Sequence, residues 1–98
     1  MLRILAKEVG KPPEERMIEN NLGAMQALVG GYIQAVPWGT YILVCNEEGK
    51  LNSLDANFRI GNDMIVGDAF FVRAGSEEFT SLTDADVEHL KNAFEFIN

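Results

Sequence analysis

The sequence predicts an α+β fold, in which a mostly antiparallel sheet of about five strands carries two helices packed on it. Short apolar runs alternate with Gly, Pro and Asn turns, which favours antiparallel strands joined by tight connections. Apolar residues recur at helical spacing in two segments, 22–29 and 84–97. No linker divides the 98 residues, so residues 1–98 are expected to form a single domain with one core.

The strands are predicted where apolar residues run or alternate between turn residues. Gly10–Glu15 interrupts the chain after the first strand, because its two prolines lack N–H donors. Pro37–Thr40 has the length and residues of a hairpin turn. Gly67-Asp68 within a strand pattern indicates a bulge or a close backbone approach. The expected strands are Leu2–Val9, Arg16–Glu19 at an edge, Tyr32–Val36, Tyr41–Cys45, Met64–Val66 and Ala69–Ala74.

A second tight turn is predicted at Asn46–Gly49. The Asn46 side chain can bond the turn backbone, and Gly49 at the last position accepts a positive φ. Lys50-Leu51 is then expected to begin the return strand. Gly75–Glu78 is a further polar turn.

The first helix is predicted over Leu22–Val29. Asn20 or Asn21 can accept hydrogen bonds from its first-turn amides, and Gly30-Gly31 is a C-terminal stop signal. Its apolar face is expected to comprise Leu22, Met25, Leu28 and Val29.

The second helix is predicted from Asp84 to about Ile97, with Thr83 as its cap. Asp84 and Asp86 lie in the first turn, where the helix dipole favours negative charge. The buried stripe is expected to comprise Val87, Leu90, Phe94 and Ile97.

The segment Asn52–Asp63 is the least regular, and we expect a long loop there, with at most one helical turn. Asn57 and Arg59 share this loop with Asp55 and Asp63. Loops held by a rigid sheet often carry function, and an arginine can bind phosphate or carboxylate through two hydrogen bonds. The alternative is an internal Arg–Asp pair that holds the loop in place.

Candidate catalytic groups are few. His89 is the single histidine, is expected to face solvent, and has no base, acid or metal partner nearby in sequence. Cys45 ends an apolar strand and is interpreted as a small core residue. Glu47 and Glu48 are adjacent, so their side chains point apart, which favours a solvated turn over a carboxylate dyad. Neither a metal site nor a phosphate-binding glycine motif is expected, and no cofactor is predicted.

Trp38 lies in a predicted turn, where a large aromatic side chain is less expected than in a core. Tryptophan is enriched in binding hot spots, although packing onto its own domain is the ordinary alternative.

The net charge of −7 argues against direct nucleic-acid binding, because an acidic surface repels phosphates. It suits a basic partner or simply solubility.

The single cysteine excludes an internal disulfide and agrees with a reducing cytoplasm. No apolar run approaches the ~20 residues that a membrane span needs. Charged residues interrupt the N-terminal apolar stretch, so no signal peptide is expected.

Two segments, Val29–Ile33 and Val44–Leu51, resemble the domain of unknown function (DUF) family 3846, which is met in phages and mobile elements of bacteria. The similarity continues through Asn57 and Arg59, Met64–Gly67 and Ser81–Asp84, and so covers nearly the whole chain in order. The resemblance implies a bacterial cytoplasm and a phage or mobile-element origin. It implies no activity.

Three functions are weighed. The first is a non-enzymatic binding protein that sequesters a small anionic, nucleotide-like signalling ligand in counter-defence. The second is an acidic inhibitor that binds a basic host protein, with a DNA mimic as its special case. The third, an enzyme, ranks last because no acid–base or nucleophile pair is found. In the first, phosphate would meet Arg59 or Lys50, and a base would stack on Trp38 or Tyr32. The full predicted set of ligand-binding residues is Arg59, Asn57, Trp38, Tyr32, Lys50 and Asn46.

A homo-oligomer, most simply a dimer, is also expected. Phe96 projects to the side opposite the apolar stripe of the second helix, and a domain this small gains from burying more apolar area. Phe96 or Trp38 is predicted to lie at the contact between subunits.

Overall fold

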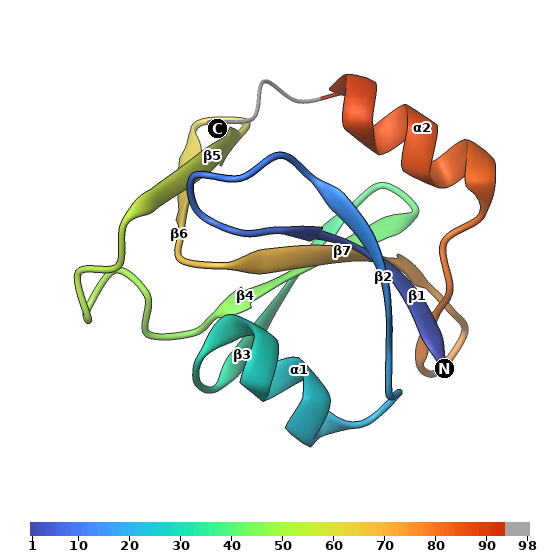
Figure 1. Ribbon diagram of the computed structural model, residues 1–98, viewed down its shortest axis with the longest axis horizontal. Helices are drawn as coiled ribbons and strands as arrows, with labels where there is room; N and C mark the ends of the chain where they lie inside the picture. Colours follow the sequence, from blue (N-terminus) through green and yellow to red (C-terminus); the bar gives the residue numbers. More distant parts are fainter. Residues whose placement is uncertain (94–98) are drawn as a thin grey trace.

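The computed structural model describes residues 1–93, and the predicted positions Phe94, Phe96 and Ile97 lie outside them. Within this range the chain forms eight strands and two helices (Figure 1). They are β1 (Leu2–Lys7), β2 (Glu14–Ile18), α1 (Leu22–Val29), β3 (Ile33–Trp38), β4 (Tyr41–Asn46), β5 (Ala56–Ile60), β6 (Asp63–Val66), β7 (Ala69–Ala74), β8 (Phe79–Thr80) and α2 (Asp84–Ala93). The predicted α+β class is confirmed.

The main sheet is antiparallel, with strand order β2-β1-β7-β4-β3 and with β8 paired to β7. The hairpin β5–β6 forms a second, two-stranded sheet. Strand β7 lies at the centre of the main sheet, and Ala69, Phe70, Phe71 and Val72 are all fully buried within it. Because alternate side chains of a strand point to opposite faces, β7 contributes to the cores on both sides.

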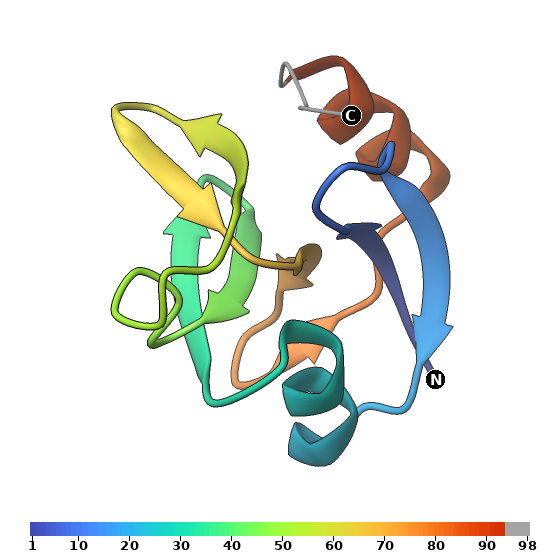
Figure 2. The same cartoon turned by 60° about the vertical axis from the view of Figure 1, so that its left-hand side comes forward.

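One face of the main sheet is covered by α1, and the other is covered by α2 together with the β5–β6 hairpin (Figures 1 and 2). Met25 and Val29 of α1 share a core cluster with Phe70. On the opposite face, Val87 of α2 and Phe58 of β5 share a core cluster with Phe71, the residue after Phe70 in β7.

Helix α1 has the predicted bounds, and its ends explain them. The Asn21 side chain accepts a hydrogen bond from the Ala24 N–H at 2.8 Å. Gly30 adopts a left-handed conformation with φ 78°, and its N–H donates to the Gln26 carbonyl. The predicted apolar face is wrong at one position, since Leu22 is 55% exposed. Leu22 is the first residue of the helix, and the buried residues of α1 are Met25 and Val29.

The β3–β4 hairpin differs from the prediction at its turn. Strand β3 continues through Pro37 and Trp38, and the turn is the two-residue Gly39-Thr40, with Gly39 at φ 60°. Proline is tolerated there because β3 is the outermost strand of the sheet.

The prediction of an irregular loop over Asn52–Asp63 is wrong, because residues 56–60 form β5. The return strand predicted at Lys50-Leu51 is also wrong, since residues 47–53 form successive turns. Strand β5 has a bulge between Ala56 and Phe58, and it pairs with β6 across Gly61-Asn62. The bulge disturbs the alternation of polar and apolar residues by which a strand is recognised.

Smaller differences concern the ends of other elements. The edge strand β2 begins two residues before the predicted Arg16. Gly67, at φ 77°, separates two strands of different sheets instead of forming a bulge within one. The short β8 was not predicted. No helix within residues 1–93 is long and apolar enough to cross a membrane.

Candidate functional site

The turn that follows β4 is organised by the Asn46 side chain. Its Oδ1 accepts a hydrogen bond from the Glu48 N–H at 2.8 Å, as predicted for this turn. Its Nδ2 donates to the Val29 carbonyl at 3.1 Å. Asn46 therefore joins the turn to the C-terminal end of α1, and it is buried.

Two glycines allow this close packing. A Cβ on Gly31 would lie 2.9 Å from Asn46 Nδ2, so a larger residue would push the amide away. Gly49 donates its N–H to the Asn46 carbonyl at 3.3 Å, which closes the turn. Its predicted positive φ is wrong, because Gly49 is absent from the residues with that conformation. Glycine is needed there because a Cβ would lie 2.9 Å from Val66 Cγ2.

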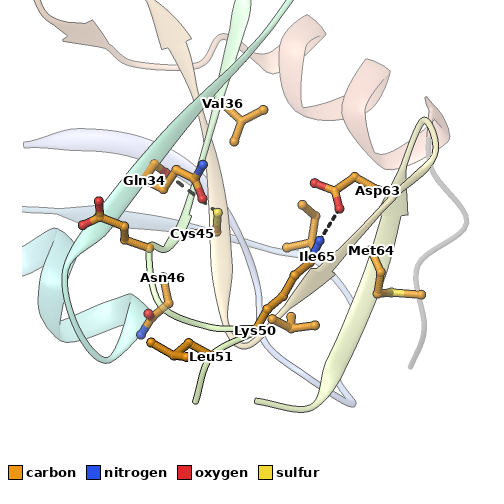
Figure 3. A pocket seen from close by; sticks show the side chains of 11 residues that line it. Gln34, Val36, Cys45, Asn46, Lys50, Leu51, Asp63, Met64 and Ile65 are labelled. Carbon is orange, nitrogen blue, oxygen red and sulfur yellow. Dashed lines mark hydrogen bonds and ion pairs between the residues drawn. The ribbon is translucent and has the colours of Figure 1, made fainter. Parts of the chain in front are cut away.

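A cleft of about 290 Å³ lies between this turn, the edge of the main sheet and β6 (Figure 3). It mixes apolar and polar side chains, and an ion pair at its rim joins Lys50 Nζ to Asp63 Oδ1 at 2.5 Å. Hydrogen bonding to Lys50 lowers the pKa of Asp63. The principal lining residues are Gln34, Val36, Cys45, Lys50, Asp63 and Ile65. We call it the β6 cleft.

Cys45 forms part of the floor of the β6 cleft and is buried, which agrees with the predicted core role. Its Sγ lies 3.9 Å from the Gln34 carbonyl, to which the thiol donates. Burial raises the pKa of the Cys45 thiol, and the nearby Asp63 raises it further. A thiol with a raised pKa is a poor nucleophile, because the thiolate is the reactive form.

A second hollow, of about 570 Å³, lies on the other side of the Asn46–Asn52 turn, against the end of α1. Tyr32 lines it with 65% of its surface exposed. Glu48 supplies the single charged side chain among the residues that line it. We call it the Tyr32 hollow.

Three of the six predicted ligand-binding residues gather around this turn. Asn46 lines both hollows, Lys50 lines the β6 cleft, and Tyr32 lines the other hollow. Tyr32 and Trp38 are separated by the length of β3, roughly 20 Å for an extended strand. A single base therefore cannot stack on both.

Trp38 fits the alternative in which it packs on its own domain. It is half-buried against the core beneath α2, and its ring stacks on Tyr41 with centroids 6.2 Å apart. The Tyr41 ring in turn stacks on His89, at 6.1 Å. His89 is exposed on α2, as predicted.

Asn57 is fully buried and does not reach the surface. Its Nδ2 donates to the carbonyls of Lys7 and Gly67, at 2.7 and 2.8 Å, and its Oδ1 accepts from Lys7 Nζ at 2.8 Å. Burial lowers the pKa of Lys7, while Asp68 opposes that effect. Asn57 therefore connects β5 to β1, and its position does not suit contact with a ligand.

Arg59 is exposed on β5, opposite Met64 of β6. The predicted alternative, an internal pair with Asp55 or Asp63, is not found: among residues 1–93 Arg59 forms no ion pair, and Asp63 is paired with Lys50 instead.

A charged cluster that was not predicted from the sequence lies at the start of α2. Asp86 Oδ1 accepts hydrogen bonds from Tyr41 Oη at 2.9 Å and from Arg73 Nη1 at 2.8 Å. Asp86 Oδ2 accepts the Thr83 N–H at 2.9 Å, and the Asp86 N–H donates to Thr83 Oγ1. This reciprocal pair is a capping box, and the Thr83-to-Asp86 spacing was the available signal.

The electrostatics of Asp86 follow from these contacts. Burial disfavours its charged form, but hydrogen bonds from Thr83, Tyr41 and Arg73 outweigh burial and lower the pKa of Asp86 to about 2. Burial and the Asp86 carboxylate raise the pKa of Tyr41. Tyr41 and Arg73 thus attach α2 to the sheet, and Thr83 caps the helix, which gives the cluster a structural explanation.

Within residues 1–93, no group of three or more His, Cys, Asp or Glu side chains could hold a metal ion. The chain belongs to the family described as a domain of unknown function, DUF3846, whose model matches residues 2–95. The resemblance identified from the sequence is therefore confirmed. No curated protein and no solved structure matches the chain.

Proposed function

We propose that this protein is a non-enzymatic binding module that engages a basic surface of another protein through the Asn46–Asn52 turn. The observation that carries the proposal is the composition of this turn and its surroundings. Tyr32 and Leu51 are 65% and 80% exposed, and between them the turn presents Glu47 and Glu48. Exposed aromatic and apolar side chains beside acidic groups suit a partner that offers both apolar and basic residues.

The distribution of ion pairs supports the same partner. Of the eight Lys and Arg residues, six have side chains bonded within the described part of the chain: Arg3, Lys7, Lys11, Arg16, Lys50 and Arg73. Glu47 and Glu48 form no ion pair there, so their charges remain available to a partner.

A second candidate is the sequestration of a small anionic ligand in the β6 cleft. The positively charged Lys50, which lines the cleft, supports this candidate. A phosphate could replace Asp63 as its partner, because both are anionic oxygen acceptors. The cleft volume of about 290 Å³ is at the lower limit for ligand sites, and Glu47 and Asp63 also line it. The small volume and the two carboxylates make an anionic ligand a less favoured partner than a basic protein.

The biological setting is part of the proposal. We place the protein in the bacterial cytoplasm during phage or mobile-element propagation, where it would act against a host protein in counter-defence. Mimicry of DNA is the less favoured version, because the carboxylates are distributed over turns and helix ends without regular spacing.

Charge reversal with a matched control tests the proposal. Partners are captured from bacteria that carry the phage or mobile element encoding this protein. The tagged baits are the wild type, the Glu47→Lys/Glu48→Lys variant and the Glu77→Lys/Glu78→Lys control. Glu77 and Glu78 are a second pair of exposed glutamates, in the turn before β8. Each variant replaces two glutamates by two lysines, so both change the net charge equally. A partner that the wild type and the control retain, and the turn variant loses, supports the proposal.

Equal loss in both variants would show that only net charge matters, and would contradict the assignment to the turn. Ligand released by denaturing the purified protein is analysed in parallel by mass spectrometry. A bound nucleotide, absent from a Lys50→Ala variant, would favour the second candidate instead.

A further inference from the structure

One long segment of the chain contains no charged residue. From Asn20 to Asn46 the sequence contains no Asp, Glu, Lys, Arg or His, although 23% of the chain is charged. This segment forms α1, β3 and β4, and α1 packs beside both strands. Leu22 and Tyr32, which belong to the segment, are both more than half exposed. In a protein of net charge −7, two copies of this uncharged segment can approach each other with little mutual repulsion.

The edge strand within this segment is β3, the last strand in the sheet order (Figure 2). The opposite edge, β2, carries Glu14, Glu15 and Arg16. Charged side chains on an edge strand hinder pairing with other chains, and natural proteins use them for that purpose. Strand β3 has no charged residue, and Pro37 is the one residue in it that lacks an N–H donor.

The register shows which backbone groups of β3 face outward. The Glu47 N–H donates to the Tyr32 carbonyl at 2.8 Å, just outside the first paired residues, Ile33 and Asn46. Hydrogen-bonded and non-hydrogen-bonded pairs alternate along an antiparallel ladder. Residues 32, 34, 36 and 38 therefore bond β4, and Ile33, Ala35 and Pro37 direct their backbone groups away from the sheet.

Proline provides an independent check on this parity. Pro37 lacks an N–H, and the register places it among the outward-facing residues, where no ladder bond to β4 is lost. The outer edge of β3 thus offers N–H donors at Ile33 and Ala35, and carbonyl acceptors at all three positions.

We propose that β3 pairs with β3 of a second copy, antiparallel and across a two-fold axis near Gln34, so that the two main sheets become continuous. Ile33 then lies opposite Ala35 of the partner subunit, and each of the two residues supplies both a donor and an acceptor. Four backbone hydrogen bonds form without involving Pro37. A two-fold arrangement requires a self-complementary edge, and this edge meets that requirement.

Ala35→Pro is the decisive variant. It removes the outward N–H of Ala35, which β4 does not use, and Pro37 shows that this parity accommodates proline. Ala35→Ser keeps the backbone donor and serves as the matched control, because residue 35 is exposed. Sedimentation velocity and light scattering are measured from 1 to 200 µM, a range around typical subunit dissociation constants. Circular dichroism confirms that each variant is folded.

The wild type and Ala35→Ser should sediment as a species of twice the 10.9 kDa chain mass. Ala35→Pro should raise the dissociation constant at least about tenfold, because each subunit loses a donor. A monomeric wild type across the whole range overturns the proposal. So does a folded Ala35→Pro that dimerises as tightly as the wild type, or an Ala35→Ser that dissociates equally.

Hydrogen exchange of the wild type gives a second readout that needs no variant. In a dimer joined through β3, the Ile33 and Ala35 amides exchange slowly at high concentration and faster on dilution, as the fraction of monomer grows. Fast exchange of both amides in a sample of dimeric mass would place the contact elsewhere and overturn the assignment to β3.

Discussion

Replacement of Asp86 by asparagine should destabilise the protein strongly while preserving the shape of the side chain. The free energy at stake can be derived from the pKa of Asp86, which is 3.8 in its ordinary state and about 2 in the fold. Since one pKa unit corresponds to ~1.4 kcal/mol, the charged carboxylate contributes roughly 2–3 kcal/mol to folding at pH 7. The corresponding fall in Tm is roughly 10–20 °C for a domain of this size.

The pH dependence provides the sharper test. The folded-state pKa of Asp86 lies below the unfolded-state value, so its stabilisation is complete above about pH 4 and is lost as the pH falls toward 2. Urea unfolding is measured for the wild type and Asp86→Asn at pH 7, 4 and 3. The difference in unfolding free energy between the two should be largest at pH 7 and should shrink below pH 4.

The control is Asp84→Asn, two residues earlier in the same helical turn. The Asp84 side chain is 95% exposed and pairs with Arg3 at 2.7 Å, so its loss should cost less than about 1 kcal/mol. Equal destabilisation by both variants, or a deficit of Asp86→Asn that does not change with pH, would refute the role assigned to the buried carboxylate.

Three other substitutions test the packing around the turn and β5. Gly49→Val should destabilise by about 1–3 kcal/mol in urea unfolding, because its Cβ would overlap Val66; an unchanged midpoint would contradict the close approach described here. Asn57→Ala should cost about 2–4 kcal/mol, since it leaves two buried carbonyls and the Lys7 ammonium without this partner, and a cost below 1 kcal/mol would mean that water replaces the amide. Arg59→Ala should change Tm by no more than about 2 °C, because Arg59 forms no ion pair within residues 1–93, and earlier unfolding by several degrees would restore the internal-pair interpretation.

The elements that the sequence predicted well are those whose signals are local. Asn21 and Gly30 determine both ends of α1, because a cap acts on amides and carbonyls within the same turn. The central strands β4 and β7 were recognised because both of their faces are buried, which leaves continuous apolar runs.

The sequence predicted the candidate site around Asn46 only in part. Asn46 and its turn were predicted, since an asparagine bonds to backbone two residues away. That its amide also reaches Val29 depends on the packing of α1 beside β4, which no local pattern specifies.

Strand β5 shows most clearly what only the tertiary structure decided. Asn57 is polar and has loop-like neighbours in sequence, and it is buried because Lys7, fifty residues away, supplies a carbonyl and an ammonium group for its amide. Asp86 was assigned from sequence to the helix dipole alone, whereas Tyr41 and Arg73 reach it from β4 and β7. The sequence by itself determined the caps, the turns and the central strands of this protein, whose interactions lie within a few residues. The tertiary structure decided which polar side chains are buried and which remain available to a partner, because burying a polar group is favourable only when distant segments supply its hydrogen bonds.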